Sequence, residues 1–537
     1  MPKPQIPNLH SQRPMPNAQF PIPNYDVIGF GDEVPGVLAL VSAAREYRRQ
    51  TNKEPRILLM SPGNLDLGIG GHLVRGGLAY LDRSQIKKEL RDARRLDTFG
   101  APGAIYKEFL QKAGVVAVGL DPRKADAVLR EMLASAGVSL LSQVEIDSII
   151  KDDGQIIGIT TSTGDVYYGR QFIDSTINAQ LAIAAGAKKL KGFDTFGLPE
   201  SELAVTVVFE TEGISAQKLK KIELAYLKRF GNAADAEARQ VLQLACGFDR
   251  QLAERVRQDM FDAKGNLKSL WIGYDYIDVR ASALSIAYHA FRRKPFSLKQ
   301  SNAILDKGNI AVLPGNRLSW NAPVFAVTGS EAEELAANGA KPTARMLEEI
   351  AFFQKWFESI GATSATPASE LYIRHAGNVT EVVEPLSGAK MLAGGVVERE
   401  ALGTFSYPFD VRGGIAGIGD KAAAKGFKTV SFPQPIFNIG IRHAQMKGIP
   451  NLAVVSPASG FRGYGCSAGR IVEFNAAVGQ GLGIAAIAAI LSDRNLADIS
   501  NQEVRQVLES TGQLPPIFGI PQTEEASKLE QFEQALA

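Results

Sequence analysis

Apolar and polar positions near the start of the chain follow first a strand-like and then a helix-like pattern. Residues 25–28 form a short apolar run, residues 37–47 repeat apolar side chains at helical spacing, and residues 56–60 form a second apolar run. Glycines separate the first run from the helical segment. This order of strand, glycine turn, helix and strand is that of a βαβ unit, whose strands pair in parallel. The pattern therefore predicts a parallel α/β sheet.

A helix and a group of short strands follow. Residues 121–136 place apolar side chains on one helical face, and Asp121 and Pro122 suit the N-cap and the first helical position. After residue 138 the apolar period changes to that of strands, with Asp-Gly and Gly-Asp pairs that favour hairpin turns. The short strands are expected at residues 138–144, 148–151, 155–161, 165–168 and 171–173. We therefore expect a three-stranded antiparallel β-meander inserted in the parallel domain.

The region of residues 190–410 mixes helical and strand-like periods and predicts a second, α+β domain. Residues 452–455 are strand-like, and a glycine-rich loop then leads to a long apolar helix that ends near residue 491. These two segments return to the pattern of the first domain. We expect a strand at residues 203–210 and helices at residues 215–230, 235–244, 277–293, 331–360, 502–510 and 524–536.

Composition narrows the class of protein without revealing a substrate. The 537 residues are too many for one apolar core, so two or three domains are expected. The 59 Lys and Arg residues nearly balance the 57 Asp and Glu residues, which gives no basic face for nucleic acid. The two cysteines, Cys246 and Cys466, are too few for a disulfide framework or a metal cluster and fit a reducing cytoplasm. We therefore expect a cytoplasmic protein without a bound metal.

Two segments bear on targeting. Residues 1–24 are rich in proline and polar side chains and lack an apolar core, so we expect an irregular arm and no signal peptide. The most apolar run, residues 481–491, is shorter than the roughly 20 residues that a bilayer requires. We therefore expect no transmembrane segment. The expected partner is a small-molecule substrate, and self-association to a homo-oligomer stays open.

The first glycine motif follows the first predicted strand. Gly29 and Gly31 are followed by Gly36, so the spacing is two residues longer than in the usual dinucleotide-binding fingerprint. Glycines at these positions let the backbone turn tightly and approach a pyrophosphate, whose charge meets the N-terminus of the next helix. The motif therefore favours dinucleotide binding, and the alternative is a glycine turn in an unrelated α/β sheet.

Ser61 follows the second predicted strand. A carboxylate usually stands at this position and binds the ribose hydroxyls of the dinucleotide. Serine forms one hydrogen bond there and cannot make the bidentate contact of a carboxylate. Asp32 and Asp66, which are near in sequence, are the candidates to make that contact in its place. In the alternative reading, Ser61 simply begins the next loop.

A second glycine-rich loop comes soon after Ser61. Gly70 and Gly71 precede His72, and another glycine pair follows at residues 76–77. Glycine pairs this close to the second strand suit a loop that lies against a flat ligand, because side chains would be in the way.

Together these segments resemble one protein family over residues 25–490. The chain is similar to the FAD-dependent oxidoreductases of the glutathione-reductase-like, two-domain flavoprotein superfamily. Residues 172–181 resemble the family's turn toward FAD, although Ile177 replaces a glycine, and residues 451–455 resemble its returning strand. The resemblance implies FAD as the cofactor, with further contacts from Val144, Thr176, Gly469, Arg470 and Ile471.

Four residues are candidates for the chemistry. The resemblance places His72 beside the flavin, as an acid–base group or a covalent tether, and the alternative is a loop histidine bonded to backbone. Arg374 and Arg412 suit an anionic substrate, or they form ion pairs between the domains. Tyr407, in a segment that resembles the family's domain junction, donates to a substrate oxygen or packs at the junction.

The resemblance implies hydride transfer between an organic small molecule and the flavin N5 atom. The alternative is a catalytically degenerate flavoprotein-like fold that acts as a binding or scaffolding protein, because the glycine spacing, Ser61 and Ile177 depart from the family pattern. No C-x-x-C pair is present, which argues against a disulfide reductase. The predicted fold class is α/β, a Rossmann-type FAD-binding domain with a parallel sheet and an antiparallel β-meander, plus an inserted α+β cap domain. The predicted boundaries are 1–24 for the arm, 25–190 and 411–490 for the FAD-binding domain, 191–410 for the substrate or cap domain, and 491–537 for a helical tail.

Overall fold

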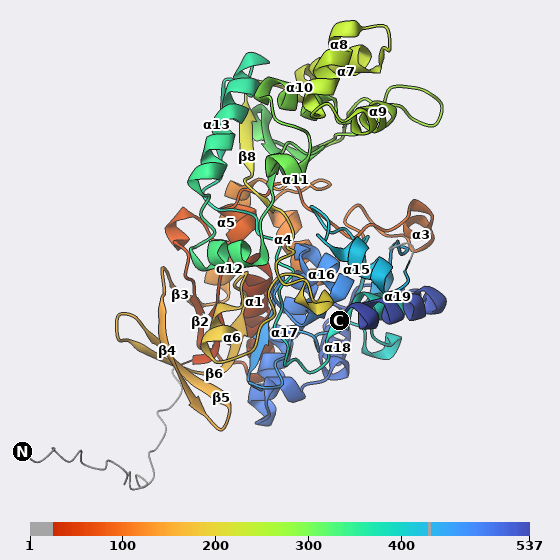
Figure 1. Ribbon diagram of the computed structural model, residues 1–537. Helices are drawn as coiled ribbons and strands as arrows, with labels where there is room; N and C mark the ends of the chain where they lie inside the picture. Colours follow the sequence, from red (N-terminus) through yellow and green to blue (C-terminus); the bar gives the residue numbers. More distant parts are fainter. Residues whose placement is uncertain (1–24, 428–430) are drawn as a thin grey trace, which may run out of the picture.

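A computed structural model describes residues 25–427 and 431–537 of the chain (Figure 1). The arm predicted for residues 1–24 lies outside these described residues. The parallel sheet has the order β3-β2-β1-β6-β19, in which every neighbouring pair runs parallel. This arrangement confirms the predicted α/β class and its Rossmann-type sheet. Its strands are β3 (Val138–Leu141), β2 (Ile57–Met60), β1 (Tyr25–Phe30), β6 (Val166–Asp174) and β19 (Leu452–Val454).

The predicted β-meander is attached to the same sheet through β6. Strand β4 (Ile146–Asp152) pairs antiparallel with β5 (Gln155–Thr161), and β5 pairs antiparallel with the first half of β6. The expected break between residues 168 and 171 is wrong, because β6 continues through Gly169 and pairs in parallel with β1 from there to Asp174. One strand therefore joins the meander to the parallel sheet.

Two helices from opposite ends of the chain cover the parallel sheet. Helix α1 (Val34–Thr51) follows β1, and α17 (Val472–Ser492) packs against it, as Figure 1 shows in red and blue. A Cβ on Gly479 would lie 2.3 Å from the carbonyl oxygen of Pro35, and one on Gly483 would lie 2.2 Å from that of Ala39. The two backbones approach this closely because α17 carries glycine at both positions.

Helix α17 is longer than the apolar run seen in the sequence. Within the part of the chain that the structure describes, it is the one helix whose length and apolar composition would allow it to cross a bilayer. Its most apolar window is 89% buried inside the protein. The helix therefore belongs to the apolar core, where it contacts α1, α4 (Ala104–Lys112) and α18 (Asn501–Ser510).

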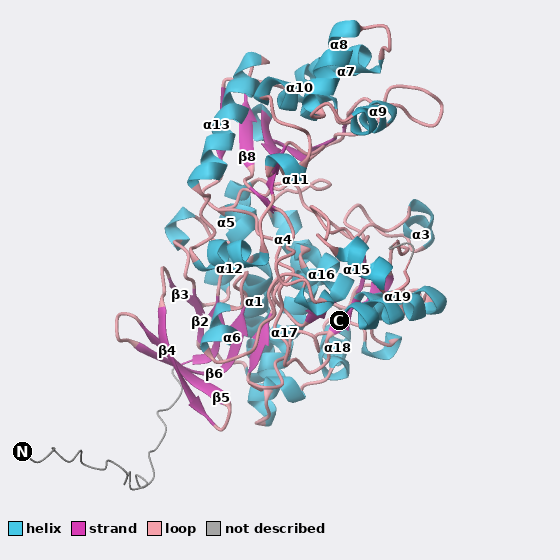
Figure 2. Cartoon of the chain, viewed as in Figure 1, coloured by secondary structure: helices cyan, strands magenta, loops and turns pink. Residues whose placement is uncertain are grey.

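Residues 205–367, which lie between the two parts of the parallel sheet in sequence, form a separate layer of helices over an antiparallel sheet, as Figure 2 shows at the top of the molecule. We call it the cap. Its core contains the stacked rings of Phe209 and Trp320, with Phe353 and Phe357 against them. The cap has its own sheet and core, and the exact domain boundaries stay a prediction. The sheet order is β15 (Ser364–Pro367), β8 (Phe209–Glu212), β13 (Arg317–Trp320), β12 (Asn309–Leu313), β10 (Tyr276–Asp278) and β9 (Trp271–Ile272).

Several predicted cap elements differ from the observed ones. The strand expected at residues 203–210 is divided into β7 (Val205–Thr206) and β8. The helix expected at 277–293 begins only at α10 (Ala283–Arg292), because residues 276–278 pair with β12. The helix expected at 331–360 is two helices, since Gly339 has a φ of +70° and ends the first of them. The main cap helices are α7 (Ala216–Gly231), α8 (Ala236–Ala245), α12 (Gly329–Ala337) and α13 (Ala344–Ser359).

The C-terminal helices lie against the first domain. Helix α18 and helix α19 (Thr523–Leu536) confirm the two helices expected in the tail. Helix α19 packs on the short helix α14 (Gly388–Leu392). Buried Leu529 and Phe532 of α19 join a small apolar cluster with Tyr464.

Candidate active site

The carboxyl ends of β1, β2 and β6 meet at one edge of the parallel sheet, where a cavity of about 610 Å³ lies. Gly31 comes directly after β1 with a φ of +95°, a conformation that favours glycine. A Cβ at this position would lie 2.6 Å from the backbone nitrogen of Thr176. The chain therefore forms a tight cradle here that a larger residue would fill. Among the residues that line the cavity are Gly31, Gly63, His72, Val144 and Thr176.

The other two glycines of the first motif have packing roles. Gly29 lies in β1, and a Cβ there would be 2.6 Å from the Leu40 side chain of α1. Gly36 was expected in the phosphate loop, but α1 begins at Val34 with Pro35 in its first turn, so Gly36 is helical. A Cβ on Gly36 would lie 2.1 Å from the Ser175 hydroxyl. Gly36 therefore lets α1 pack against the turn after β6.

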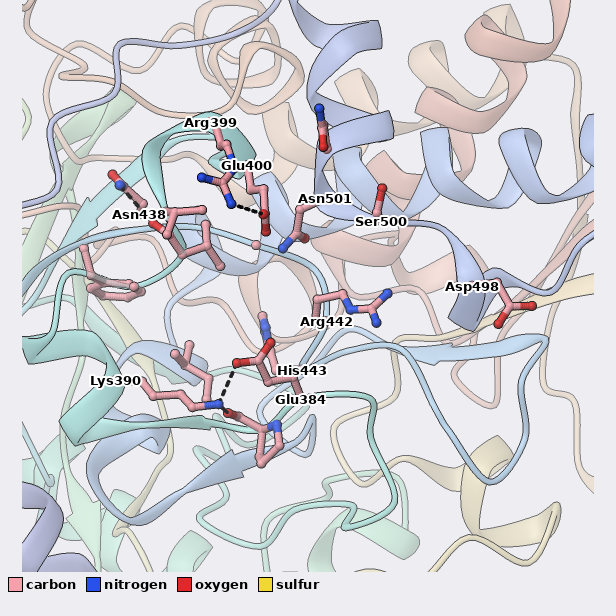
Figure 3. Close-up of a pocket in the computed structure, with 18 residues that line it drawn as sticks. Glu384, Lys390, Arg399, Glu400, Asn438, Arg442, His443, Asp498, Ser500 and Asn501 are labelled. Atoms are coloured by element: carbon pink, nitrogen blue, oxygen red, sulfur yellow. Dashed lines mark hydrogen bonds and ion pairs between the residues drawn. The ribbon is translucent and has the colours of Figure 1, made fainter.

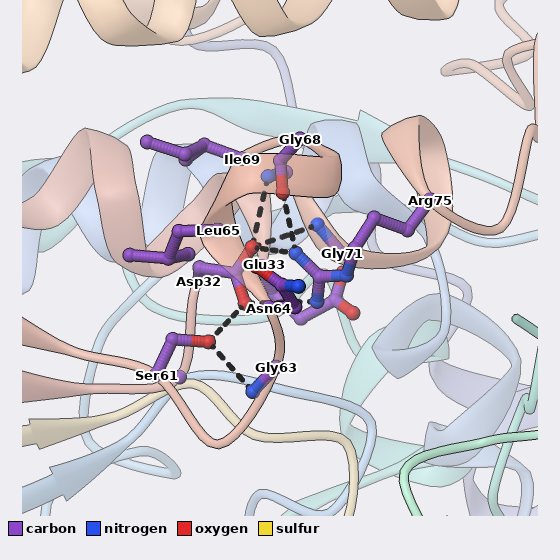
Figure 4. Close-up of polar contacts among 12 residues, drawn as sticks. Asp32, Glu33, Ser61, Gly63, Asn64, Leu65, Gly68, Ile69, Gly71 and Arg75 are labelled. Carbon is purple, nitrogen blue, oxygen red and sulfur yellow. Dashed lines mark hydrogen bonds and ion pairs between the residues drawn. The ribbon is translucent and has the colours of Figure 1, made fainter. Parts of the chain in front are cut away.

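The sequence interpretation missed the importance of Asp32, which lies in the turn between β1 and α1. Its buried carboxylate accepts hydrogen bonds from the Ser61 hydroxyl (2.7 Å) and the Gly70 amide (3.1 Å), and it forms an ion pair of 2.5 Å with Arg75 (Figure 4). Burial alone would raise the pKa of Asp32, but the Arg75 guanidinium and these hydrogen bonds hold it below its usual value. Ser61 therefore binds Asp32, one of the two residues expected to contact the ribose in place of Ser61.

Glu33, next to Asp32, holds the His72 loop. His72 lies in the short helix α2 (Gly71–Val74), and its Nδ1 atom is 2.5 Å from the Glu33 carboxylate. A Cβ on Gly71 would lie 2.0 Å from the same carboxylate, and Gly70 has a φ of +128°. The two glycines therefore allow Glu33 to reach His72. A signal for this arrangement was present in the sequence as two acids directly after Gly31.

His72 is buried beneath the cap. Its ring stacks on Tyr372, with 4.9 Å between ring centroids and 12° between the planes. Its Nε2 atom is buried and has no hydrogen-bond partner among the described residues. Because Nδ1 contacts Glu33, the free Nε2 is the nitrogen that remains to exchange a proton with a ligand.

Val144 and Thr176 lie on the other sides of the cavity. The Val144 amide donates to the carbonyl of Ser61 at 2.8 Å, which ties its loop to the end of β2. Thr176 donates from its hydroxyl to Asp174 at 2.7 Å. Burial raises the pKa of Asp174 to about 6. The hydrogen bonds that Asp174 accepts from Thr176 shape the turn after β6. Ile177, which stands where the resemblance expects a glycine, lies in this turn.

The N-terminus of α17 approaches the His72 loop. Ile471 is the N-cap of α17, and the glycine-rich loop before it ends in the short helix α16 (Cys466–Gly469). A Cβ on Gly469 would lie 2.4 Å from the ring of Phe461, so Gly469 serves close packing. A cavity of only about 10 Å³, the space of one water, lies among His72, Tyr372, Arg470 and Ile471 and their neighbours.

The predicted substrate residues gather next to this small cavity. Arg470 forms an ion pair of 2.5 Å with Asp410 and lies over the ring of Tyr407, 5.4 Å from its centroid. Arg374 lies over Tyr372, 4.1 Å from the ring centroid. Arg412 forms an ion pair with Asp306 of the cap, which is the interdomain alternative considered for it. The structure thus brings together His72, Arg374, Tyr407, Arg412 and Arg470 from distant parts of the chain.

These features can be tested against a dinucleotide. The Gly31 cradle and the cavity of about 610 Å³ fit a ligand that lies along the sheet edge, close to backbone. Asp32 and Glu33 already accept hydrogen bonds near the start of α1, so a pyrophosphate there would share this region with two carboxylates. His72 lines both this cavity and the space of one water beside Tyr372 and Arg470, so a ligand along the sheet edge would lie next to the imidazole.

A second hollow, of about 560 Å³, lies away from these residues (Figure 3). Four of its charged side chains form two contacts: Lys390 contacts Glu384 at 2.8 Å, and Arg399 contacts Glu400 at 3.8 Å. None of its lining residues belongs to the parallel sheet or to the glycine loops. It therefore adds nothing to the predicted site.

Comparison with known proteins relates the chain to flavoenzymes. The family model described as FAD dependent oxidoreductase matches residues 26–508. No curated protein matches the chain in sequence. Similar solved structures include an L-proline dehydrogenase from P. horikoshii (11% identity, 92% of this chain and 99% of that chain, TM-score 0.35). They also include a geranylgeranyl bacteriochlorophyll reductase-like protein from Thermoplasma acidophilum (11% identity, 96% and 90%, TM-score 0.37) and the halogenase PltM in complex with phloroglucinol and FAD (12% identity, 90% and 72%, TM-score 0.35).

Proposed function

The chain belongs to the family of FAD dependent oxidoreductases, and from this premise we propose that it transfers a hydride between an organic small molecule and the flavin N5 atom. FAD is the cofactor of this enzyme. When bound, FAD supplies the two-electron chemistry, and the protein supplies position, electrostatics and exclusion of water.

The sheet edge would hold the dinucleotide part of FAD. Because Gly31 has no Cβ, the space beside it is free for the pyrophosphate. Thr176 and Val144 line the same cavity, with Val144 on the side where the resemblance places the adenine. Arg75 lies between Asp32 and Glu370, so it neutralises carboxylate charge near the start of α1. These contacts support binding of the dinucleotide in spite of the two acids.

His72 would hold or release the proton that accompanies hydride transfer. Glu33 fixes the imidazole through Nδ1, which leaves the buried Nε2 free. Tyr372 covers the ring from the cap side, so water reaches the imidazole poorly. The single observation that carries the proposal is this fixed imidazole with one free nitrogen, placed between the glycine loop and the start of α17.

The proposal is tested first on the purified protein. We expect a yellow protein that releases FAD, and not FMN, when it is denatured, because the chain offers a glycine cradle and a separate adenine-side strand. Anaerobic addition of an organic substrate should then bleach the flavin absorbance, and deuterium at the carbon that loses the hydride should slow the bleaching. A colourless protein that does not take up FAD, or bleaching that is insensitive to deuterium at every position, would contradict the proposal.

A further inference from the structure

Arg374 is a buried cation that has no carboxylate partner in the described part of the chain. Only 1% of its surface is exposed. One end of the guanidinium, Nη1, donates to the Ala204 carbonyl (2.6 Å) and the Thr206 hydroxyl (2.9 Å), and Nη2 donates to the Asn321 side-chain oxygen (3.2 Å). All three acceptors are neutral. A buried cation is costly unless an anion compensates it, so this arrangement points to a ligand.

Other hydrogen-bond donors around Arg374 also lack acceptors. The Nε atoms of Arg374, Arg412 and Arg470 and the Nδ2 atom of Asn321 are buried, and the described residues offer them no partner. Arg412 and Arg374 share a neighbour, because the Ala204 amide donates to the Arg412 carbonyl at 2.9 Å and the Ala204 carbonyl accepts from Arg374. Arg470 and Tyr372, the ring under Arg374, line one small cavity. Burial, together with the charges of Arg412 and Arg470, lowers the pKa of Arg374 to about 10. The cluster is therefore rich in donors and poor in acceptors.

The charges of the cluster define what it can bind. Arg412 is paired with Asp306. Arg470 is 2.5 Å from Asp410, and the part-exposed Asp82 is 3.8 Å from it. Neither pairing extends to Arg374, which stays the one guanidinium without a direct carboxylate contact. The three carboxylates equal the three guanidiniums in charge, but none of them contacts Arg374, whose buried Nε atom still lacks an acceptor among the described residues.

We propose that Arg374, with Arg412 and Arg470 beside it, binds the carboxylate of an organic acid substrate. The inference rests on the proposed hydride transfer, because the cluster adjoins Tyr372, whose other face covers His72. A planar guanidinium matches a planar carboxylate in geometry and offers it parallel hydrogen bonds. A carboxylate adds one negative charge beside Asp82, Asp306 and Asp410, whereas a phosphate dianion adds two, so the monoanion is favoured.

The test uses the FAD-loaded protein and simple probes. Acetate and benzoate are compared with the neutral acetamide and benzamide, and with inorganic phosphate, by the midpoint of thermal unfolding and by the flavin absorption spectrum. We expect a carboxylate to raise the midpoint by several degrees and to perturb the spectrum, because a ligand of the native state stabilises it. The amides and phosphate should do neither.

Three variants assign the effect to Arg374. In Arg374→Gln the carboxylate-dependent rise should vanish, and in Arg374→Lys, which keeps the charge and loses the fork, carboxylate binding should weaken at least tenfold. Arg292→Gln is the matched control, because Arg292 is also a largely buried arginine but is paired with Glu349 inside the cap. This control should keep the full carboxylate response.

Equal stabilisation by amides or phosphate, or an unchanged response in Arg374→Gln, would overturn the inference. If Arg374→Gln does not fold, an unchanged carboxylate affinity in Arg374→Lys overturns it. The proposed function fails separately. If the protein binds carboxylates but no organic substrate reduces its flavin, the anion site is supported and the proposed hydride transfer is wrong. If neutral substrates reduce the flavin and the protein does not bind carboxylates, the hydride transfer is supported and the anion site is wrong.

Discussion

At the scale of single residues, the site depends on glycines, which leave space for a neighbouring group, and on side chains that each contact one fixed partner. Gly31 leaves space between β1 and the turn after β6, and Gly71 leaves space for Glu33. Glu33 in turn fixes the imidazole of His72. Each of these positions therefore predicts a sharp response to substitution.

Gly31→Val should abolish FAD binding. The valine would be forced into a φ of +95° and would place its Cβ 2.6 Å from the Thr176 nitrogen, in the space that the pyrophosphate needs. The flavin released per chain, measured after denaturation, should fall close to zero. Gly154→Val is the control, since Gly154 also has a positive φ (+78°) but nothing lies within 4 Å of its Cβ position. Full FAD content in Gly31→Val would show that the cofactor lies elsewhere.

His72→Gln should slow flavin reduction by about 10²–10⁴-fold, which is the usual contribution of an acid–base group. FAD content should stay near normal, and acid precipitation of the unmodified enzyme should release the flavin, because we expect no covalent tether. Stopped-flow absorbance under anaerobic conditions measures the rate. His289→Gln is the control, because both ring nitrogens of His289 already contact backbone atoms within the cap. An unchanged reduction rate in His72→Gln would assign His72 a structural role.

At the scale of elements, short helices depend on caps supplied from distant parts of the chain. Glu533 of α19 accepts hydrogen bonds from the backbone amides of Gly388 and Ala389, at the start of α14, and of Tyr464. Burial nevertheless raises the pKa of Glu533 to about 7. The attachment of α19 is therefore sensitive to pH near neutrality.

The stability of the protein should fall by about 1 kcal/mol between pH 6 and pH 8 because of Glu533. The unfolded carboxyl titrates near pH 4.3, so the folded state binds the extra proton, and this stabilisation is present at low pH and is lost as the pH rises through about 7. Denaturant unfolding at several pH values measures it. Glu533→Gln should remove this part of the pH dependence, whereas Glu530→Gln, on an exposed position of α19, should not. Identical pH profiles for Glu533→Gln and the unmodified protein would contradict the prediction.

The element scale also shows how far sequence alone could lead. Hydrophobic periods were enough to predict β1, α1, β2, α5 (Pro122–Ser135) and the meander, because each of these elements buries one regular face. They failed at residues 277–282 and 338–343, where pairing with β12 and the positive φ of Gly339 override local pattern. In the site, the glycine loops and the arginines could be found from motifs. The partners Asp32–Arg75 and Glu33–His72 could not, since only the folded chain brings them together.

At the scale of the whole molecule, the cap is attached to the first domain by polar contacts between distant loops. Asp275, beside β10 of the cap, accepts the backbone amides of Val116, Ala117 and Val118 at 2.7–3.1 Å. Arg317 of β13 forms an ion pair of 2.7 Å with Asp121, the N-cap of α5. The relative position of the cap and the flavin site is therefore set by a few buried contacts.

Asp275→Ala should destabilise the protein by about 1–3 kcal/mol, because three part-buried amides lose a charged acceptor. The loss should appear as faster proteolytic cleavage near residues 116–118 and as slower flavin reduction at normal FAD content. Asp278→Ala is the control, since the half-exposed side chain of Asp278 has Arg280 as its polar partner and forms no hydrogen bond with the described residues of the first domain. Equal protease resistance in the two variants would show that Asp275 does not hold the cap.

The discontinuous parallel sheet also bears on how the protein is made. Strand β19 and helix α17 complete the core that β1 and α1 begin, yet the whole cap is synthesised between them. At translation rates of about 5–20 residues per second, β1 and α1 wait for some tens of seconds for these partners. The cap, whose sheet lies entirely within residues 209–367, is then expected to fold first on the ribosome. The nascent first domain meanwhile exposes an unfinished sheet edge, and when α17 emerges it does so as an apolar segment that chaperones or a membrane can capture before α1 does.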